Sequence, residues 1–342
     1  MSRNTSDYLR YVTESIAIDF GFVILITGFI GNLLNIITFL TLKTFRETSC
    51  AFYLTSASCA NLIHLAASLL SRILITGYNI DLTRTSSFTC KLRQYVAVIA
   101  PLMALSCMCL ATIDQYATLT LRWRHFSRRT LACRFVVLIF VFWCLINIPV
   151  IVYYDRSVFL VENQWQCLII NMDYNIYFSR FHITFLLGFI QLTIRTVFGL
   201  LAFINVRRLR NRQSTIIRLE RDKQITSMVL FETVIDVLLS SPFFIYYAYK
   251  PYILITDAAD ISVYTFIITT TTNLNYAAYA IGFYIYCCAS SRFRKQVFHV
   301  VVGVHMKYWC KMNVTGTANQ IAPCNSGNRA VSLEMDIRIE QC

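Results

Sequence analysis

Long apolar stretches alternate with short polar segments along most of the chain. Seven of these stretches contain roughly 20 residues or more, the length at which an α-helix crosses about 30 Å of hydrocarbon. They fall near residues 16–42, 50–76, 92–121, 132–154, 179–205, 225–249 and 261–287. The pattern predicts an all-α membrane protein, built as a bundle of seven transmembrane helices.

Composition and charge fit a membrane protein and predict its orientation. Hydrophobic residues make up 56% of the chain and charged residues 14%, against about 25% charged residues in ordinary soluble domains. Roughly two-thirds of the 31 Lys and Arg residues fall in 43–49, 122–134, 207–223 and 292–342, and positively charged loops stay in the cytoplasm. The N-terminus is therefore expected outside and the C-terminus inside. The basic excess is expected to face anionic membrane lipid, and nucleic acid is not expected as a partner.

This orientation divides the chain into three parts. Residues 1–15 are expected to form an extracellular N-terminus, which lacks the apolar core of a cleaved signal peptide. Residues 16–298 are expected to form the transmembrane domain, and 299–342 a cytoplasmic tail. At the end of the domain, residues 290–298 predict a short amphipathic eighth helix along the inner membrane surface. The apolar residues of this helix expected to face lipid are Phe293, Val297 and Phe298.

Short motifs in a fixed order connect the chain with a known family of membrane proteins. The motifs are Gly31-Asn32, Ala60-Asn61-Leu62, Asp114-Gln115-Tyr116, Trp143, Ser240-Ser241-Pro242, Gly282-Phe283-Tyr284-Ile285-Tyr286 and Phe293-Arg294. With them the chain resembles the class A (rhodopsin-like) G-protein-coupled receptors over about residues 16–298, and in particular divergent invertebrate receptors related to neuropeptide receptors. The resemblance implies a plasma-membrane receptor that binds an extracellular ligand and signals to a heterotrimeric G protein.

Two of the 13 cysteines, Cys90 and Cys167, fall on the predicted outer side of the membrane. Cysteines in an oxidising compartment are expected to pair, and the resemblance implies the same disulfide, between the start of the third helix and the following outer loop. Asn4 begins an N-glycosylation sequon on the outer side, so a glycosylated N-terminus is predicted. Cys310, on the inner side after the eighth helix, is a candidate for palmitoylation.

The resemblance also assigns residues to the end that faces the G protein, namely Asp114, Gln115, Tyr116 and Tyr286. Gln115 stands where the family has the arginine of its D-R-Y motif. Glutamine still forms hydrogen bonds but lacks the charge and the fork geometry of arginine. Two interpretations therefore stay open, a receptor that couples to a G protein and a seven-helix receptor that binds ligand without coupling. A transporter or channel is a third and less favoured alternative, because the chain shows no convincing internal repeat.

No cofactor or metal site is predicted. Where the family binds a sodium ion, its helix-two aspartate is Asn61 here, its helix-seven asparagine is Gly282 and its helix-three serine is Ala104. Without the carboxylate, a hard cation loses its main ligand. The sequence shows no zinc spacing, phosphate loop or nucleophile–base set, so the chain is not expected to be an enzyme.

Several ionisable residues fall inside predicted transmembrane helices, among them Arg195, Glu232 and Asp236. A charge at the bilayer centre costs about 2.5–3.5 kcal/mol on insertion scales, so each of them needs a partner. Arg195 and Asp236 fall near the middle of helices five and six, which are neighbours in the family's fold. We expect an ion pair between them. The alternative is that Arg195 extends to the inner interface while Asp236 is neutral.

The candidate ligand pocket lies toward the outer ends of the helices. His64 and Arg72 are eight residues apart on roughly one face of helix two, within reach of an acidic or amidated ligand end. The aspartate of amine receptors is replaced by Ala97, and the lack of lysine in 261–287 excludes an opsin-like retinal site. Aromatic residues crowd the outer ends of helices six and seven, which suits a peptide. The residues assigned to the pocket are His64, Arg72, Ala97, Tyr247 and Tyr276.

Overall fold

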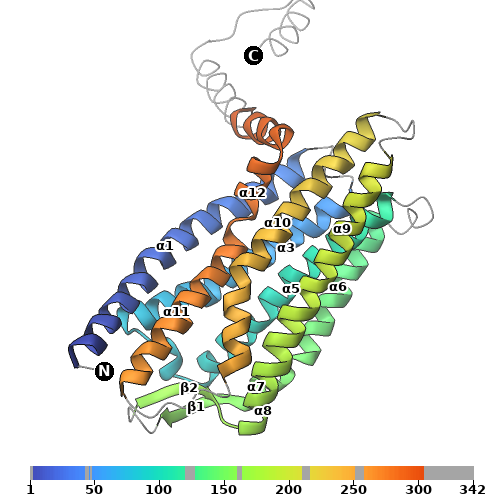
Figure 1. Cartoon of the computed structure of the whole chain (residues 1–342). Coiled ribbons are helices and arrows are strands. Elements are labelled where there is room, and N and C mark those ends of the chain that lie inside the picture. The colour runs from blue at the N-terminus through green and yellow to red at the C-terminus, as the bar shows by residue number, and fades with distance from the viewer. Residues whose placement is uncertain are drawn as a thin grey trace, which may run out of the picture. The chain divides into compact units, whose positions relative to one another are not determined.

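The computed structural model describes residues 3–42, 46, 48–119, 128–159, 164–209, 216–250 and 258–303. The chain divides into two compact units, Met1–Val297 and Phe298–Cys342, and each is described by itself. The first unit is a bundle of long helices that carries a two-stranded hairpin at one end (Figure 1). We call this end the hairpin end. The N-terminus lies there, and the first helix runs from it to the opposite end.

The described residues form seven helical spans, several of them divided into consecutive elements. They are α1 (Arg3–Thr41); α3 (Ser49–His64) with η1 (Leu65–Leu69), α4 (Leu70–Arg72) and η2 (Ile73–Gly77); α5 (Ser87–Leu119); α6 (Arg129–Ile146) with α7 (Ile148–Tyr153); α8 (Met172–Tyr177) with η5 (Phe178–Ile190) and α9 (Gln191–Leu209); α10 (Ile216–Tyr249); and α11 (Ala258–Ala280) with α12 (Gly282–Ala289). A short 3₁₀ turn, η3 (Leu82–Arg84), lies between the second and third spans, and residues 291–303 are also helical. The prediction of an all-α bundle of seven transmembrane helices is confirmed.

Six of the spans in the described part of the chain are long and apolar enough to cross a bilayer. The seventh, α11, is more polar, because it carries a run of four threonines followed by two asparagines. Thr269, Thr272, Asn273 and Asn275 are all buried, so α11 turns its polar residues toward the bundle. By contrast, large apolar side chains such as Leu138 of α6 are exposed on the outside of the bundle, where hydrocarbon would cover them.

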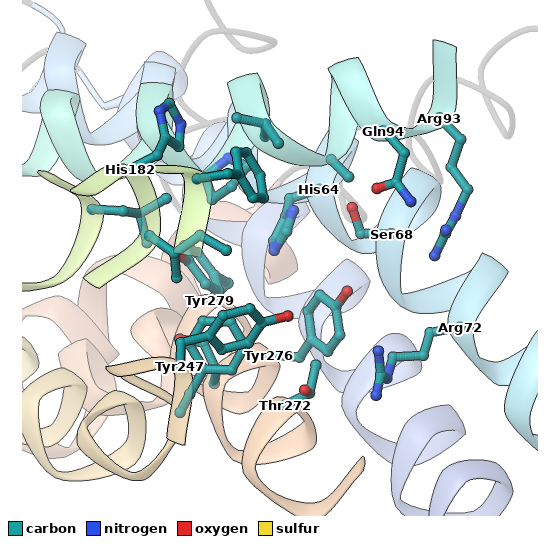
Figure 2. Close-up of a pocket in the computed structure, with 18 of the residues that line it drawn as sticks. His64, Ser68, Arg72, Arg93, Gln94, His182, Tyr247, Thr272, Tyr276 and Tyr279 are labelled. Atoms are coloured by element: carbon teal, nitrogen blue, oxygen red, sulfur yellow. The ribbon is translucent and has the colours of Figure 1, made fainter. Parts of the chain in front are cut away.

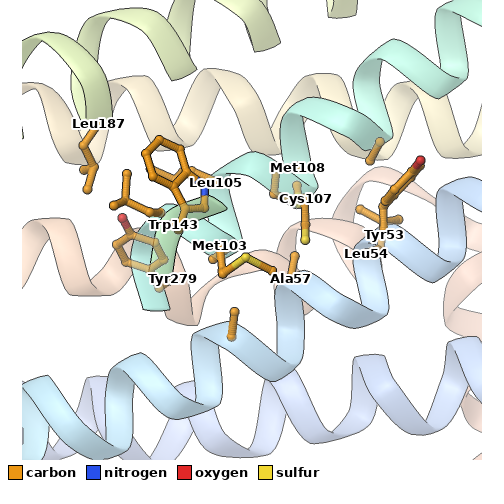
Figure 3. Packing of buried hydrophobic residues seen from close by; sticks show 14 of the residues in the cluster. Tyr53, Leu54, Ala57, Met103, Leu105, Cys107, Met108, Trp143, Leu187 and Tyr279 are labelled. Carbon is orange, nitrogen blue, oxygen red and sulfur yellow. The ribbon is translucent and has the colours of Figure 1, made fainter. Parts of the chain in front are cut away.

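The third span, α5, occupies the centre of the bundle. In its most apolar stretch 72% of the residues are buried, against 17–39% in the corresponding stretches of the other five. Figure 3 shows Met103 and Cys107 of α5 in the same buried cluster as Ala57 of α3 and Trp143 of α6. The indole N–H of Trp143 donates to Ser106 Oγ at 3.0 Å, so the polar atom of this buried ring has a partner.

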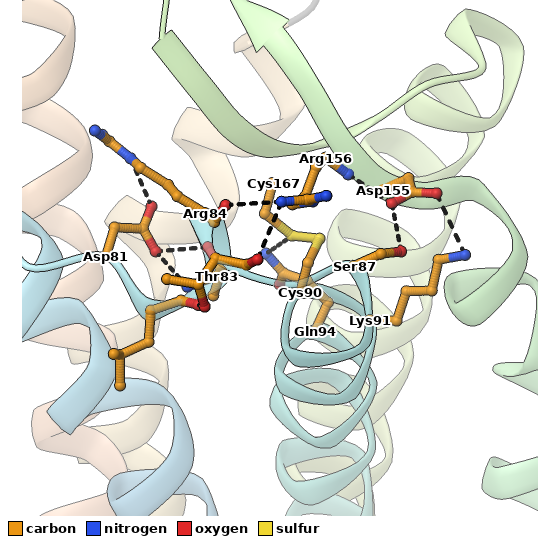
Figure 4. The surroundings of a disulfide bond; sticks show 12 residues. Asp81, Thr83, Arg84, Ser87, Cys90, Lys91, Gln94, Asp155, Arg156 and Cys167 are labelled. Atoms are coloured by element: carbon orange, nitrogen blue, oxygen red, sulfur yellow. Dashed lines mark hydrogen bonds and ion pairs between the residues drawn. A yellow bond between two sulfur atoms is a disulfide. The ribbon is translucent and has the colours of Figure 1, made fainter.

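The hairpin consists of β1 (Tyr154–Phe159) and β2 (Gln164–Ile169), which pair antiparallel. A disulfide bond joins Cys167 of β2 to Cys90 near the start of α5 (Figure 4). Asp155 of β1 accepts a hydrogen bond from Ser87 Oγ and lies 3.4 Å from Lys91 Nζ, so charge also attaches the hairpin to α5. Only a loop was predicted between the fourth and fifth spans. Two strands of six residues offer few alternating positions from which a sheet could be recognised.

The first helix is longer than predicted. It begins at Arg3, so residues 3–15, which were expected to form a separate N-terminus, continue the helix. Arg10 and Glu14 lie one turn apart and form an ion pair at 3.2 Å, a spacing that stabilises exposed helices. The polar composition of this segment therefore marks an extension of the helix beyond its most apolar part.

Phe293 corrects a second expectation, because its side chain does not face lipid. It is 0% exposed, and its ring packs against the rings of Phe39, Phe283 and Tyr286 at the opposite end of the bundle. Aromatic partners on two spans offer this ring more contact area than the membrane surface would. The basic residues around Phe293 are exposed, as expected of an amphipathic helix.

Candidate functional site

A polar cavity of about 240 Å³ lies inside the bundle toward the hairpin end (Figure 2). Its walls come from the second, third, fifth, sixth and seventh spans, and Tyr154 of β1 contributes from the hairpin. The structure brings together all five residues that the sequence assigned to a ligand pocket. These lining residues are His64, Arg72, Ala97, Tyr247 and Tyr276.

Several buried polar atoms in this cavity have no hydrogen-bond partner among the described residues. They include His64 Nδ1, His182 Nε2, Thr272 Oγ1 and Asn275 Oδ1, and all four residues are at most 6% exposed. An unsatisfied buried donor or acceptor costs about 1–3 kcal/mol, so such groups in native structures call for water or a ligand. The cavity is therefore equipped to bind a polar molecule.

Aromatic rings hold the two histidines in place. The His64 ring lies 5.1 Å from the ring of Tyr276 and 4.8 Å from that of Tyr279. The His182 ring stacks on Phe178 at 5.2 Å, with an interplanar angle of 10°. The lining thus combines polar groups with apolar ring faces, as small-molecule and peptide-end sites commonly do.

π-Helical turns shape the part of the cavity wall that the second and fifth spans form. The segments η1, η2 and η5 are π-helical. The first contributes Ser68 to the cavity lining, and η5 contributes His182, Ile183 and Leu187. The segment η2 begins directly after Arg72. A π-helical turn contains more residues than an α-helical one, so it changes the direction in which the following side chains point. Such turns occur often at functional sites. A helical-wheel argument from the sequence assumes regular turns and could not foresee them.

Sequence reasoning missed Arg93, Gln94 and His182. Arg93 lies one turn after Cys90 on α5, and its Nε donates to Ser71 Oγ of α4 at 2.7 Å. The sequence could have indicated Arg93 as a pocket residue, because it is a charged residue close to the predicted outer end of helix three. His182 lies in the fifth span and offered no comparable signal, because its position depends on the π-helical segment η5.

A cluster of buried charges lies deeper in the bundle. Arg195 Nη2 of α9 is 2.7 Å from Asp236 Oδ2 of α10, and the two side chains are 0% and 10% exposed. The structure thus brings the predicted pair together, and the Arg195 side chain does not extend to the interface. One turn earlier on α10, Glu232 Oε2 accepts a hydrogen bond of 2.5 Å from the Tyr286 hydroxyl. The sixth span is therefore linked to both the fifth and the seventh.

Gly282 leaves the space that Glu232 occupies. A Cβ atom at position 282 would lie 2.9 Å from Glu232 Oε1, closer than such contacts normally come. Gly282 stands where the resemblance places an asparagine of helix seven. The carboxyl of Glu232 and a larger side chain at position 282 could not both fit without movement.

Residues expected to face the G protein are mostly buried in this conformation. Asp114, Gln115 and Tyr286 are 7%, 3% and 2% exposed, and Tyr116 is half-buried. Gln115 Oε1 accepts a hydrogen bond from Thr226 Oγ1 of α10 at 3.3 Å, which links the third and sixth spans. The opposite end of the bundle is therefore closed around these side chains.

Asp114 has a hydrogen-bond partner on the second span. Within the described residues, Ser49 Oγ of α3 donates to Asp114 Oδ2 at 2.7 Å.

Two predicted modification sites remain predictions. Asn4 lies in the first turn of α1, but its side chain is outside the described residues. Cys310 lies outside the described residues altogether. Within the described residues there is no cluster of three or more His, Cys, Asp or Glu that could hold a metal ion.

Comparison with known proteins places this geometry in a family. Residues 31–290 match the sequence model described as "7 transmembrane receptor (rhodopsin family)". Because this match covers most of the chain, the protein belongs to the rhodopsin family of seven-transmembrane receptors. It is a multi-pass membrane receptor and not an enzyme, and membership implies an extracellular ligand and a G protein as partners in general. A search of curated proteins found no match to the chain.

Proposed function

We propose that the protein is a plasma-membrane receptor that binds a neuropeptide in the cavity described above and activates a heterotrimeric G protein. In this proposal the hairpin end and the N-terminus face the cell exterior, as the distribution of basic residues suggests. The observation that carries the proposal is the cavity itself, in which several buried polar atoms lack partners among the described residues.

The size of the cavity suggests how a peptide would bind. Its volume of about 240 Å³ is somewhat below that of typical sites for drug-sized ligands, which occupy roughly 300–1,000 Å³. It therefore suits the end of a peptide better than a whole one. The rest of the ligand would lie against β1 and β2, which the disulfide holds over the third span.

Activation is a population shift, because an agonist that binds one conformation more tightly increases its share. The sixth span carries the contacts that must change. Within the described residues, Thr226 links it to Gln115, Asp236 pairs with Arg195, and Glu232 accepts from Tyr286. Outward movement of α10 at the opposite end would break the first of these contacts and expose Gln115 and Tyr116 to a G protein.

A receptor that binds ligand without coupling is the second candidate, and Gln115 is the observation that favours it. The family's arginine contacts the G protein, whereas Gln115 is neutral and is 3% exposed in the closed state. A glutamine offers fewer donors than a guanidinium and no charge. Ligand binding would then be retained while nucleotide exchange is not stimulated.

A G-protein activation assay in cells separates these functions. The native chain and Gln115→Arg are compared at equal surface expression against a panel of neuropeptides. A response from the native chain supports the signalling receptor. A response from Gln115→Arg alone supports the non-coupling receptor. Peptide-driven ion or solute flux, measured in the same cells, would contradict both and favour the transporter or channel.

A further inference from the structure

The cavity contains two arginines, and this charge restricts the ligand more narrowly than the fold does. We infer that Arg72 and Arg93 form a carboxylate site, so that the ligand of this receptor carries an anionic end. The inference rests on the proposed role of the cavity in ligand binding, and it names the chemical class of that ligand.

The two arginines come from different spans but face the same space. Arg72 ends α4 in the second span, and Arg93 lies in the first part of α5. Both line the cavity, and Figure 2 shows them on the same side of it, with Ser68 and Tyr276 nearby. The Nε of Arg93 donates to Ser71, which fixes the direction of its guanidinium.

Neither guanidinium is neutralised within the described part of the chain. Arg72 and Arg93 take part in none of the ion pairs there, and Arg72 Nε is buried without a hydrogen-bond partner. None of the described residues that line the cavity is Asp or Glu. The acid with an electrostatic effect on Arg93 is Asp81, but Asp81 already binds Arg84 at 3.1 Å.

The two guanidinium charges in this partly buried cavity repel each other, and removing them from water costs free energy. A bound anion would relieve both penalties at once. The guanidinium fork matches the two oxygens of a carboxylate, which it can bind through paired hydrogen bonds. An amidated end of the same shape carries no charge and would leave both arginines uncompensated.

The remaining walls indicate what adjoins the carboxylate. Phe178, Phe243 and Tyr247 contribute ring faces to the cavity, while His64 and Asn275 offer unpartnered polar atoms. An aromatic or large apolar group next to the carboxylate fits this combination. Such a group could be the last residue of a peptide with a free C-terminus or a small aromatic acid.

The test measures binding to the purified full chain in lipid nanodiscs, without a G protein. The first probe pair is N-acetyl-phenylalanine and its neutral amide. The second is a set of hexapeptides ending in phenylalanine, made with a free carboxylate or an amide. Binding is followed by ligand-observed NMR on the native chain, Arg72→Gln, Arg93→Gln and the double variant. Arg10→Gln, an arginine on α1 outside the cavity, is the matched control.

We expect the acids to bind at least about tenfold more tightly than the amides. Each single Arg→Gln change should weaken acid binding by about 10–100-fold, the usual value of a charge-assisted hydrogen bond. Affinity for the amides should stay unchanged, as should acid affinity in Arg10→Gln. Arg72→Lys, which keeps the charge but not the fork, should fall between native and Arg72→Gln. It thereby distinguishes lost recognition from a damaged fold.

Several results would overturn the inference. They are equal binding of acid and amide, acid binding that survives in the double variant, and no acid binding up to the solubility limit. A preference for acid confined to the hexapeptides identifies a peptide C-terminus as the source, and one shared by N-acetyl-phenylalanine identifies a small acid. An agonist response to amidated peptides alone would support the receptor proposal while contradicting the carboxylate site. Acid binding without G-protein activation would support the carboxylate site while contradicting the receptor proposal.

Discussion

The buried ion pair between Arg195 and Asp236 gives an ordered set of stability predictions. The two charged atoms are 2.7 Å apart, and the Arg195 side chain is 0% exposed. Removing one partner of a buried pair typically costs about 3–5 kcal/mol, because it leaves an uncompensated charge. Replacing both partners by apolar residues of similar size is often neutral or stabilising. The pair should therefore behave as a unit.

The two single variants should differ from each other. Asp236→Asn leaves a guanidinium that cannot lose its proton and whose remaining acidic neighbour is Glu232, so a penalty toward the lower end of about 3–5 kcal/mol is expected. Arg195→Met leaves Asp236, whose carboxyl can become neutral by taking up a proton and so avoid part of the cost. The double variant Arg195→Met/Asp236→Leu should be close to the native chain. The expected order of stability is double variant, Arg195→Met, Asp236→Asn.

Thermal unfolding of the purified receptor, together with surface expression in cells, measures this order. A double-mutant cycle isolates the interaction between the two positions from their separate effects. The charge-swapped variant Arg195→Asp/Asp236→Arg adds an independent check, since it restores opposite charges. The reasoning is refuted if the double apolar variant loses as much stability as the two single variants added together, with no recovery in the swapped variant.

Three further predictions concern other contacts. Gly282→Ala should destabilise the receptor by about 1 kcal/mol, measured by thermal unfolding, because the new Cβ would lie 2.9 Å from Glu232 Oε1 and the end of that side chain, which is hydrogen-bonded to Tyr286, must shift; an unchanged midpoint would contradict this. Cys90→Ser should cost about 4–5 kcal/mol, since the disulfide closes a loop with a sequence separation of 77; native-like surface expression and unfolding would argue against it. Hydrogen bonds from Ser87 and from its own strand lower the pKa of Asp155 below 3.8. The resulting stabilisation is present above the ordinary carboxyl pKa of about 4 and is lost as pH falls through the lowered pKa. The protection factors of the hairpin amides, which correct for the slower intrinsic hydrogen exchange in acid, should therefore fall at acid pH in the native chain and not in Asp155→Asn.

Much of this architecture was predictable because membrane helices follow one strong rule. Each span must be long and apolar enough to cross the bilayer, and hydropathy alone reveals that. The seven spans and the position of Cys90 at the start of the third follow from this rule. The hairpin does not, since its strands lie outside the membrane and depend on pairing with each other. Phe293 was misplaced for a related reason, because an amphipathic pattern shows that one side is apolar but not what covers it.

The candidate site was predictable only in part. Arg72 and Tyr276 were assigned to the pocket, and the structure places both in the cavity lining. Arg93 and His182 were missed, although they carry much of its polar character. The position of His182 depends on tertiary packing and on the π-helical turns of η5, which shift side chains away from the regular helical spacing. Propensity and periodicity record neither effect.

The departures from the family's motifs change where the acidic groups of the bundle lie. The helix-two aspartate is replaced by Asn61, whose amide donates to Asn32 Oδ1 at 3.2 Å. Acidic groups lie instead on the sixth span, where Asp236 pairs with Arg195 and Glu232 also interacts with it electrostatically. The positive charge near the centre of the bundle thus belongs to the chain itself, and no carboxylate is left on helix two to attract a cation from solvent. Because Arg195 sits on the fifth span and its acidic partners on the sixth, any movement between these spans changes the distance within the pair. The charge interaction between Arg195 and Asp236 therefore couples the position of the sixth span to that of the fifth.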